Sequence, residues 1–250
     1  MFQHLPKHFI VLPIVCVLSL LSACSTLKES DAVALSSTSD PLSGVNRSIY
    51  AFNDGLDRAI LKPVAEGYTT VVPEPARSGV SNFFSNLFEP LNIANNLLQG
   101  KFDRALSSTY RFVVNSTVGV AGLIDVADLH EVEETPEDFG QTLAVWGVGS
   151  GPYLMMPFFG PSNLRDGIAR ITSGFVYYPI SEISDDSGVD LGLTILSTVD
   201  ARAGLLGADE VLEQQGKEYK YDFLKTAYDQ NRLNQIYDGK APETEEDYEF

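Results

Sequence analysis

The segment from Phe139 to Leu164 reads FGQTLAVWGVGSGPYLMMPFFGPSNL, and its 26 residues include no charged side chain. It is long enough to cross a bilayer as a helix, but glycines weaken a helix and prolines break one. These interruptions are Gly140, Gly147, Gly149, Gly151, Pro152, Pro157, Gly160 and Pro161. A broken apolar segment must satisfy its backbone groups inside the protein or beside water. The sequence therefore allows two interpretations: a buried segment that crosses a core, or a loop at membrane depth that lines a cavity.

The sequence on both sides of this stretch predicts helices, because apolar residues recur every three or four positions. In the first of them Asp40 is the expected N-cap, Pro41 starts the helix and Pro63 ends or kinks it. The apolar stripe of this helix is Val45, Ile49, Phe52, Leu56 and Ile60, and that of the helix over residues 101–115 is Phe102, Leu106, Tyr110 and Val113. The predicted helices span residues 40–61, 76–87, 89–98, 101–115, 136–146, 162–174, 189–206 and 218–237. Runs that alternate apolar and polar residues are scarce, so the sequence predicts a mainly α fold.

The composition excludes several classes of protein. The chain has 250 residues, with 17 basic and 34 acidic side chains and a formal net charge of -17. Such a charge argues against a nucleic acid as partner, because binding phosphates requires a basic face. Hydrophobic residues make up 44%, which is too apolar for a disordered chain and too polar for a membrane protein with many spans.

The N-terminus has the pattern of a secretion signal. Residues 1–23 combine a weakly positive start with an apolar run of about 13 residues, too short to span a bilayer. Leu21-Ser22-Ala23 before Cys24 resembles a bacterial lipobox, which implies cleavage before Cys24 and acylation of its sulfur and its amino group. The alternative is an ordinary signal peptide with an incidental cysteine. Ser25 after the cysteine favours the outer membrane, by resemblance to the usual lipoprotein sorting pattern.

Two flanking segments are expected to lack a fold of their own. Residues 24–40 hold the acylated cysteine and a Ser/Thr-rich tether, and residues 241–250 form an acidic tail. The predicted folded domain is residues 41–240.

Motifs for catalysis, metals and cofactors are missing from the sequence. His130 is the single histidine after the signal, and neither a zinc spacing nor a Walker loop is present. The run Gly147-Val148-Gly149-Ser150-Gly151 has too few spacers for a dinucleotide fingerprint and is followed by Pro152. No nucleophile elbow appears, which weakens a lipase interpretation. We therefore predict a protein that is not an enzyme and that uses neither metal nor cofactor.

Several runs together resemble the MlaA (VacJ) lipoprotein family, over roughly Asp40 to Arg232. The most telling are Asp138-Phe139-Gly140-Gln141-Thr142-Leu143 and Trp146-Gly147-Val148-Gly149-Ser150-Gly151-Pro152-Tyr153. The others are Asp40–Arg47, Phe52–Asn53, Lys62–Ala65, Val72–Phe83, Glu89–Pro90, Leu98–Gly100, Arg111–Gly119, Gly160–Ser162 and Leu164–Asp166.

The resemblance implies a single helical, ring-like domain with irregular Gly/Pro-rich loops, lying in the inner leaflet of the outer membrane. It implies that mislocalised phospholipid leaves the outer leaflet through a central amphipathic channel, so that lipid asymmetry is maintained. It also implies two partners, a trimeric outer-membrane porin and a periplasmic phospholipid-binding shuttle protein. A transporter of the inner membrane would supply the energy, in agreement with the missing nucleotide motif.

Nine residues are the candidates for a lipid channel or its gate. They are Asn46, Arg47, Phe52, Asn53, Gly147, Gly149, Gly151, Pro152 and Tyr153. The polar groups on the first helix could hold a gate or lip by hydrogen bonds, or merely brace the helix against a loop. Two competing functions remain: an anchored scaffold that recruits partners without conducting lipid, and a phospholipid hydrolase.

Overall fold

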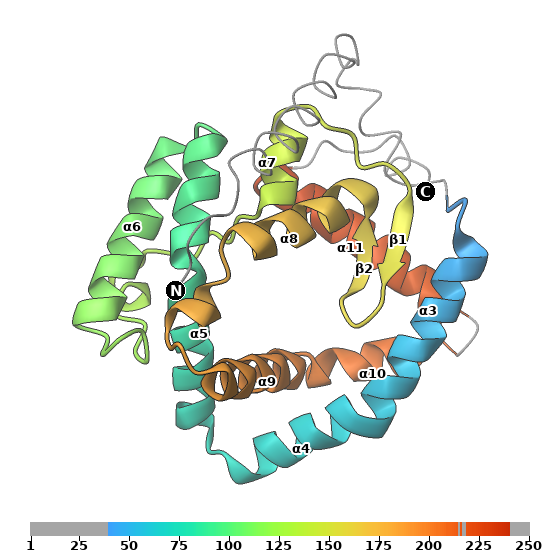
Figure 1. Cartoon of the computed structure of the whole chain (residues 1–250), viewed down its shortest axis with the longest axis horizontal. Helices are drawn as coiled ribbons and strands as arrows, with labels where there is room; N and C mark the ends of the chain where they lie inside the picture. The colour runs from blue at the N-terminus through green and yellow to red at the C-terminus, as the bar shows by residue number, and fades with distance from the viewer. Residues whose placement is uncertain (1–39, 215, 217–218, 241–250) are drawn as a thin grey trace.

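The computed structural model describes residues 40–214, 216 and 219–240, and these residues are mainly α-helical, as predicted (Figure 1). The signal, Cys24, the tether and the acidic tail lie outside the described residues, so the predictions for them stay predictions.

The first segment of the chain stays helical beyond Leu61, where the sequence predicted an end or a kink. Helix α3 (Ser43–Leu56) runs through a π-helical turn (Asp57–Leu61) into α4 (Lys62–Val71). Pro63 does not end the helix, because it lies in the first turn of α4, directly after the π-helical turn. The predicted N-cap is also wrong: the helix begins at Ser43, and Asp40 instead accepts a hydrogen bond from Asn46 (2.8 Å).

Helices α5 (Glu74–Leu98) and α6 (Phe102–Thr117) form an antiparallel pair. The sequence predicted two helices where α5 is one, because Pro90 lies inside α5 without ending it. Gly100 adopts a positive φ of 76° and ends the helix, as expected.

The charge-free stretch contains a short helix, a loop and a β-hairpin. Helix α7 (Phe139–Val145) is capped by Asp138, and strands β1 (Tyr153–Met156) and β2 (Gly160–Asn163) pair antiparallel, with Tyr153 opposite Asn163. The predicted helix 136–146 is therefore too long, and the hairpin was not predicted. Helix α8 (Leu164–Val176) follows, with Asn163 rather than Ser162 as its cap.

The remaining elements are two 3-10 turns (Asp128–His130 and Pro179–Glu182), α9 (Ser187–Gly204), α10 (Leu206–Gln214) and α11 (Lys220–Ile236). Helix α10 was not predicted as a separate helix. Among the described residues, α9 and α10, which meet at 48°, satisfy the length and composition criteria for a membrane span only as a bent pair, and no single helix satisfies them.

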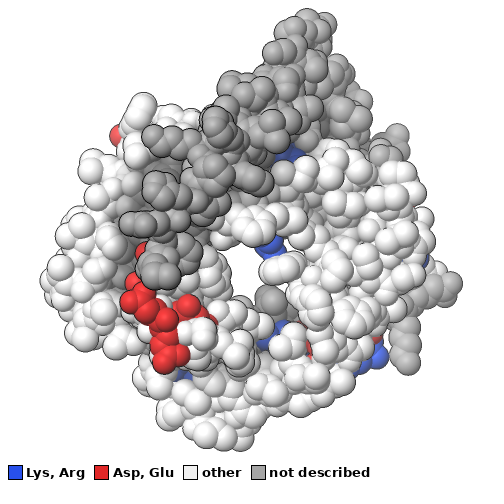
Figure 2. Space-filling model, in the orientation of Figure 1, with Lys and Arg blue, Asp and Glu red and all other residues white. Residues whose placement is uncertain are grey.

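The helices surround a central opening. In Figure 1, α8, the β-hairpin, α10, α9 and α5 border it in turn, and α3 and α4 form the outer edge on one side. The space-filling view shows that this opening is not filled by side chains and that Lys or Arg atoms lie at its margin (Figure 2).

Burial in the α5–α6 pair is inverted relative to a water-soluble protein. The predicted stripe of α6 is exposed, at 69% for Phe102 and 70% for Leu106. The side chains enclosed between the helices are mostly polar; we call them the polar seam: Asn86, Glu89, Asn92, Asn96, Ser108, Arg111 and Asn115. The stripe is thus in the predicted register, but it faces outward.

A conventional apolar core is found only where α3, β1 and α11 meet, in the part of the chain that the structure describes. Three residues there are fully buried, Tyr153, Met155 and Tyr221, and three others pack against them. The whole cluster, which we call the aromatic junction, is Ile49, Tyr50, Tyr153, Met155, Tyr221 and Tyr228. Its rings meet edge to face, at 5.8 to 6.1 Å between centroids.

Candidate functional site

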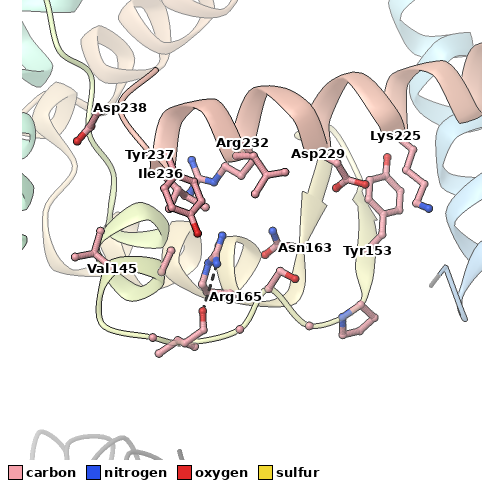
Figure 3. A pocket seen from close by; sticks show the side chains of 18 of the residues that line it. Val145, Tyr153, Asn163, Arg165, Lys225, Asp229, Arg232, Ile236, Tyr237 and Asp238 are labelled. Carbon is pink, nitrogen blue, oxygen red and sulfur yellow. Dashed lines mark hydrogen bonds between the residues drawn. The ribbon is translucent and has the colours of Figure 1, made fainter. Parts of the chain in front are cut away.

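A cavity lies between the loop that follows α7 and helix α11. We call it the loop cavity; its volume is about 950 Å³. Figure 3 shows Arg165 reaching into it from the start of α8, with Asp229 and Arg232 on the α11 side. Five predicted site residues line it: Gly147, Gly149, Gly151, Pro152 and Tyr153. The candidates on α3 do not line this cavity.

Two of the loop's glycines have conformations that other residues rarely adopt. Gly147 and Gly151 have φ of 87° and 67°, and a Cβ on Gly151 would lie 3.0 Å from the Cβ of Leu164. The loop can therefore approach the start of α8 closely. Arg165 there donates to the carbonyl of Val148 (3.3 Å), which ties the loop to the helix.

A buried ion cluster stands behind the loop cavity. Arg232 donates from Nε to Asp166 (2.8 Å) and from both Nη atoms to Asp138 (2.6 and 2.7 Å), while Arg165 donates to Asp166 (2.8 Å). Burial alone raises the pKa of Asp138 and Asp166, but the guanidinium groups outweigh it and hold both below the usual value. Both carboxylates are therefore ionised, and the cluster is a fixed polar wall. A Cβ on Gly140 would lie 2.4 Å from Asp166 Oδ1, so glycine is required there.

Three further groups beside the loop cavity differ from this wall, because they have no hydrogen-bond or ion-pair partner within the described residues; the Lys225 ammonium lies 5.9 Å from the centre of the Tyr153 ring. Lys225 and Asp229 lie one turn apart on α11 and form no ion pair there. Burial raises the pKa of Asp229 to about 6, opposed by the charge of Lys225. The Tyr153 hydroxyl is buried and makes no hydrogen bond, and burial raises its pKa as well.

A second cavity, of about 510 Å³, lies on the other side of the ion cluster. Arg232 lines both cavities, so the cluster separates them. We call this one the aromatic cavity, because its lining includes Phe88, Phe139, Phe159, Phe175, Tyr177, Tyr178 and Tyr228. Arg170 adds a charge there, with its guanidinium carbon 5.6 Å from the centre of the Phe159 ring. The elements that contribute to it, α5, α8 and the β-hairpin, border the central opening in Figure 1.

The predicted polar residues of α3 hold the β-hairpin in place. Asn46 donates to the Tyr153 carbonyl (3.1 Å) and accepts from the Met155 amide (2.9 Å). Asn53 donates to the Met156 carbonyl (3.0 Å) and accepts from the Phe158 amide (2.9 Å). These contacts fit the bracing interpretation directly. The gate role stays a prediction.

The other two α3 candidates are exposed. Phe52 stacks edge to face on Phe158 at the tip of the hairpin, 5.4 Å between centroids. Arg47 pairs with Asp222 (2.8 Å) and covers the ring of Tyr221 (4.3 Å). Arg47 therefore joins α3 to α11 rather than lining either cavity.

Sequence reasoning missed the charged residues of this region. Asp138, Arg165, Asp166 and Arg232 were not among the nine candidates. Lys225, Asp229 and Arg232 lie at spacings of four and three, which places them on one helix face, and that spacing is the signal that could have found them.

The described residues hold no group of three or more His, Cys, Asp or Glu side chains that could bind a metal ion. His130 is exposed and contacts the Tyr110 hydroxyl (2.6 Å).

The fold and the two cavities together define a helical protein that exposes apolar stripes and contains cavities with both charged and aromatic linings. The model of the family described as "MlaA lipoprotein" matches residues 38–235. The chain belongs to this family.

Named relatives agree with that assignment. The chain is similar to the "Intermembrane phospholipid transport system lipoprotein MlaA" of Escherichia coli, with 41% identity over 186 residues, 72% of each chain. It is 29% identical to the Haemophilus influenzae protein of the same name over 233 residues, 92% of each chain. A solved structure described as the "structural basis for maintenance of bacterial outer membrane lipid asymmetry" aligns with a TM-score of 0.69 and 35% identity, covering 80% of this chain and 100% of that one.

Proposed function

We propose that this protein is an outer-membrane lipoprotein that lies in the inner leaflet and removes mislocalised phospholipid from the outer leaflet through its central opening. The relatives named for intermembrane phospholipid transport support this function. It passes the lipid to a periplasmic phospholipid-binding shuttle protein and sits beside a trimeric porin, as the family resemblance implies.

The observation that carries the proposal is the inverted burial of the α5–α6 pair. Phe102 and Leu106 would cost free energy in water, whereas in lipid their exposure costs nothing. Within the polar seam the charges of Glu89 and Arg111 pair with each other (3.1 Å), as charges at membrane depth usually do. Other helices expose large apolar side chains too, among them Phe175 (88%) and Val176 (79%) on α8. The surface therefore suits a body set into a membrane leaflet.

The central opening supplies a path with two kinds of wall. Moving a lipid headgroup through hydrocarbon is costly, because its polar groups lose water. Lys or Arg atoms at the margin of the opening can attract the phosphate (Figure 2), while the aromatic cavity offers apolar area to the acyl chains. A path of this kind lowers the cost for both parts of the molecule.

The test is the phospholipid content of the outer leaflet, measured by surface acyl-transfer labelling in cells with and without the protein. Deletion should raise it, and the wild-type gene should restore it. Phe159→Asp places a charge in the aromatic cavity and should fail to restore it. Leu129→Asp, at an exposed residue outside both cavities, is the matched control and should restore it.

The competing functions give different results in the same cells. An anchored scaffold would restore asymmetry with both variants, provided that they fold and retain the porin on purification. Release of fatty acid from labelled phospholipid by the purified protein, abolished by replacement of one serine, would favour the hydrolase. An unchanged outer leaflet on deletion would contradict lipid removal.

A further inference from the structure

We propose that the loop after α6, residues 118–124, inserts its side chains between lipids at the boundary between headgroups and acyl chains. We call this loop the apolar tip. The inference rests on the proposed function, because it requires the protein to lie in a membrane leaflet. It goes further by assigning a membrane contact of defined depth to a segment that is neither helix nor strand.

The large side chains of the apolar tip are exposed although none of them is polar. They are Val118, Val120, Leu123 and Ile124, and between 46 and 67% of each is exposed. Residues 113–124 include no charged side chain. A water-soluble protein rarely exposes a continuous apolar patch of this kind, and such a patch marks a surface that contacts a partner or a membrane.

The backbone of the apolar tip is turned inward, so that most of its amides are used within the chain. The amides of Val118 and Gly119 donate to Val114 (2.9 and 3.1 Å), Ala121 to Ser116 (3.1 Å), Gly122 to Asn115 (2.8 Å), Leu123 to Val120 (3.3 Å) and Ile124 to Gly119 (2.9 Å). A surface loop in water can leave such groups to the solvent. With these amides bonded internally, the loop loses less free energy when it leaves water.

The conformation that turns the amides inward is strained. Val120 and Ala121 have φ of 54° and 57°, in the left-handed region that a β-branched residue rarely adopts. Gly122 follows with φ of 90°, and a Cβ there would lie 2.6 Å from the Cβ of Asn86, so the loop lies directly against the end of the polar seam. Strain of this kind is usually retained where it serves a function. Here it keeps polar backbone groups inside and apolar side chains outside.

The remaining polar groups limit how deep the apolar tip can lie. The carbonyls of Val118, Ala121 and Gly122 accept no hydrogen bond from the described residues, so the centre of a bilayer would be costly for them. At the level of the headgroups, water and lipid N–H groups can donate to these carbonyls. Asp125 follows the tip directly, pairs with Arg111 (2.6 Å) and belongs at the same level. The boundary between headgroups and acyl chains satisfies both kinds of group.

Lipid fits the apolar tip better than a protein partner does. A protein interface carries about one hydrogen bond per 100–200 Å². No side chain of the tip has a hydrogen-bond donor or acceptor, whereas acyl chains require none. The tip also follows directly on the exposed stripe of α6, from Phe102 to Val113, which the proposed function already assigns to lipid. The two surfaces together form one continuous contact with the leaflet.

The experiment measures depth by fluorescence quenching on the purified full chain in phosphatidylethanolamine and phosphatidylglycerol vesicles. The chain has one tryptophan, so Trp146→Phe gives a background without tryptophan. In that background Val118→Trp reports on the tip, at a residue with ordinary helical backbone (φ -75°). Its emission should shift to the blue, and lipid brominated near the glycerol should quench it more than lipid brominated at the chain ends. Glu133→Trp, at an exposed residue of the following acidic segment, is the matched control and should be quenched by neither.

A second measurement tests whether the tip is covered in the native membrane. Cys24 is expected to carry lipid and Cys16 to leave with the signal, so an introduced cysteine would be the single free thiol. In isolated outer membranes, Val118→Cys should react with a charged maleimide far more slowly than Glu133→Cys. After denaturation the two should react at the same rate.

The outcomes separate lipid from other surroundings. Stronger quenching from the shallow bromine together with slow labelling supports the inference. Stronger quenching from the chain ends would contradict the depth. Absence of quenching would overturn the inference: slow labelling would then mean that a protein covers the tip, and fast labelling that the tip lies in water. None of these results decides lipid removal, which the deletion assay tests by itself.

Discussion

The polar seam and the aromatic junction bury different kinds of side chain. Between α5 and α6 the enclosed groups are amides, a hydroxyl and the pair of Arg111 with Glu89 (3.1 Å), and the apolar stripe faces outward. Where α3, β1 and α11 meet, tyrosines and Met155 are enclosed. In lipid, apolar association between helices provides no driving force, so hydrogen bonds and close packing must hold helices together. The α5–α6 pair therefore fits the membrane placement proposed above, whereas the aromatic junction is packed like the core of a water-soluble protein.

The strongest way to break the polar seam is to remove one charge of its ion pair. Arg111→Met would leave Glu89, which is 1% exposed, without its cation, and should lower the free energy of unfolding by about 3–5 kcal/mol. Urea unfolding of the detergent-solubilised protein measures this loss. Arg111→Met with Glu89→Gln removes both charges and should recover much of it. A single variant as stable as wild type would mean that the pair does not hold the seam.

The corresponding test of the aromatic junction is Asn46→Ala. This change leaves the Tyr153 carbonyl and the Met155 amide without their partner and should cost about 2–4 kcal/mol, the loss of two buried contacts. Thermal unfolding and faster amide exchange at Met155 measure it. Arg47→Ala, on the same helix but with an exposed ion pair, should cost less than about 1 kcal/mol. Equal losses in the two variants would contradict the bracing role of Asn46.

A smaller effect is expected at the ion cluster between the two cavities. Gly140→Ala would press a Cβ against Asp166 and Arg232, at 2.4 and 2.5 Å, and should cost about 1–3 kcal/mol. Gly192→Ala, inside α9 with nothing within 4 Å, should instead stabilise the protein by about 0.5–1 kcal/mol. Chemical denaturation of both variants gives the comparison, and a neutral Gly140→Ala would show that the cluster can move aside.

The smallest effect concerns pH. Because the folded pKa of Asp229, about 6, is above its unfolded value of about 3.9, the folded state binds the extra proton between these values. Ionisation of Asp229 therefore lowers the free energy of unfolding as pH rises from about 4 to 6. The carboxylates of Asp138 and Asp166 have lowered pKa values, so their contribution to the free energy of unfolding is instead lost as pH falls below the usual pKa of an aspartate. The difference between Asp229→Asn and wild type isolates this group. The variant should gain relative stability from pH 4 to 7, and a constant difference would contradict the raised pKa.

The sequence predicted the helices well and their environment poorly. Periodicity located the stripe with Phe102 and Leu106, but a stripe in the right register can face a core or a lipid, and the pattern is the same in both cases. Pro63 was expected to end or kink the first helix and Glu89-Pro90 to start a new one, yet Pro63 lies in the first turn of α4 and Pro90 is tolerated within α5. The hairpin escaped notice because β1 is apolar throughout and does not alternate.

One wall of the loop cavity consists of candidates from the sequence, and their role in a lipid channel stays a prediction. Gly147, Gly149 and Gly151 do line a cavity, since a broken charge-free loop has few other ways to satisfy its backbone. The opposite wall comes from α11, more than 70 residues further along the chain. In the sequence the charged residues of α11 have the pattern of an ordinary solvated helix face. Only the tertiary structure shows that they line a cavity together with Tyr153.

The bond between the Tyr221 hydroxyl and the Asp40 carboxylate has a consequence for how the chain folds. It joins residues 181 positions apart, near the two ends of the described chain. Contacts at such separation form slowly, because the entropy of closing the loop must be overcome before the contact contributes. We therefore expect α5 and α6 to pair early and the ring to close last. Until α11 docks, β1 lacks part of its cover, so a chain shortened before Lys220 should remain open and susceptible to proteases.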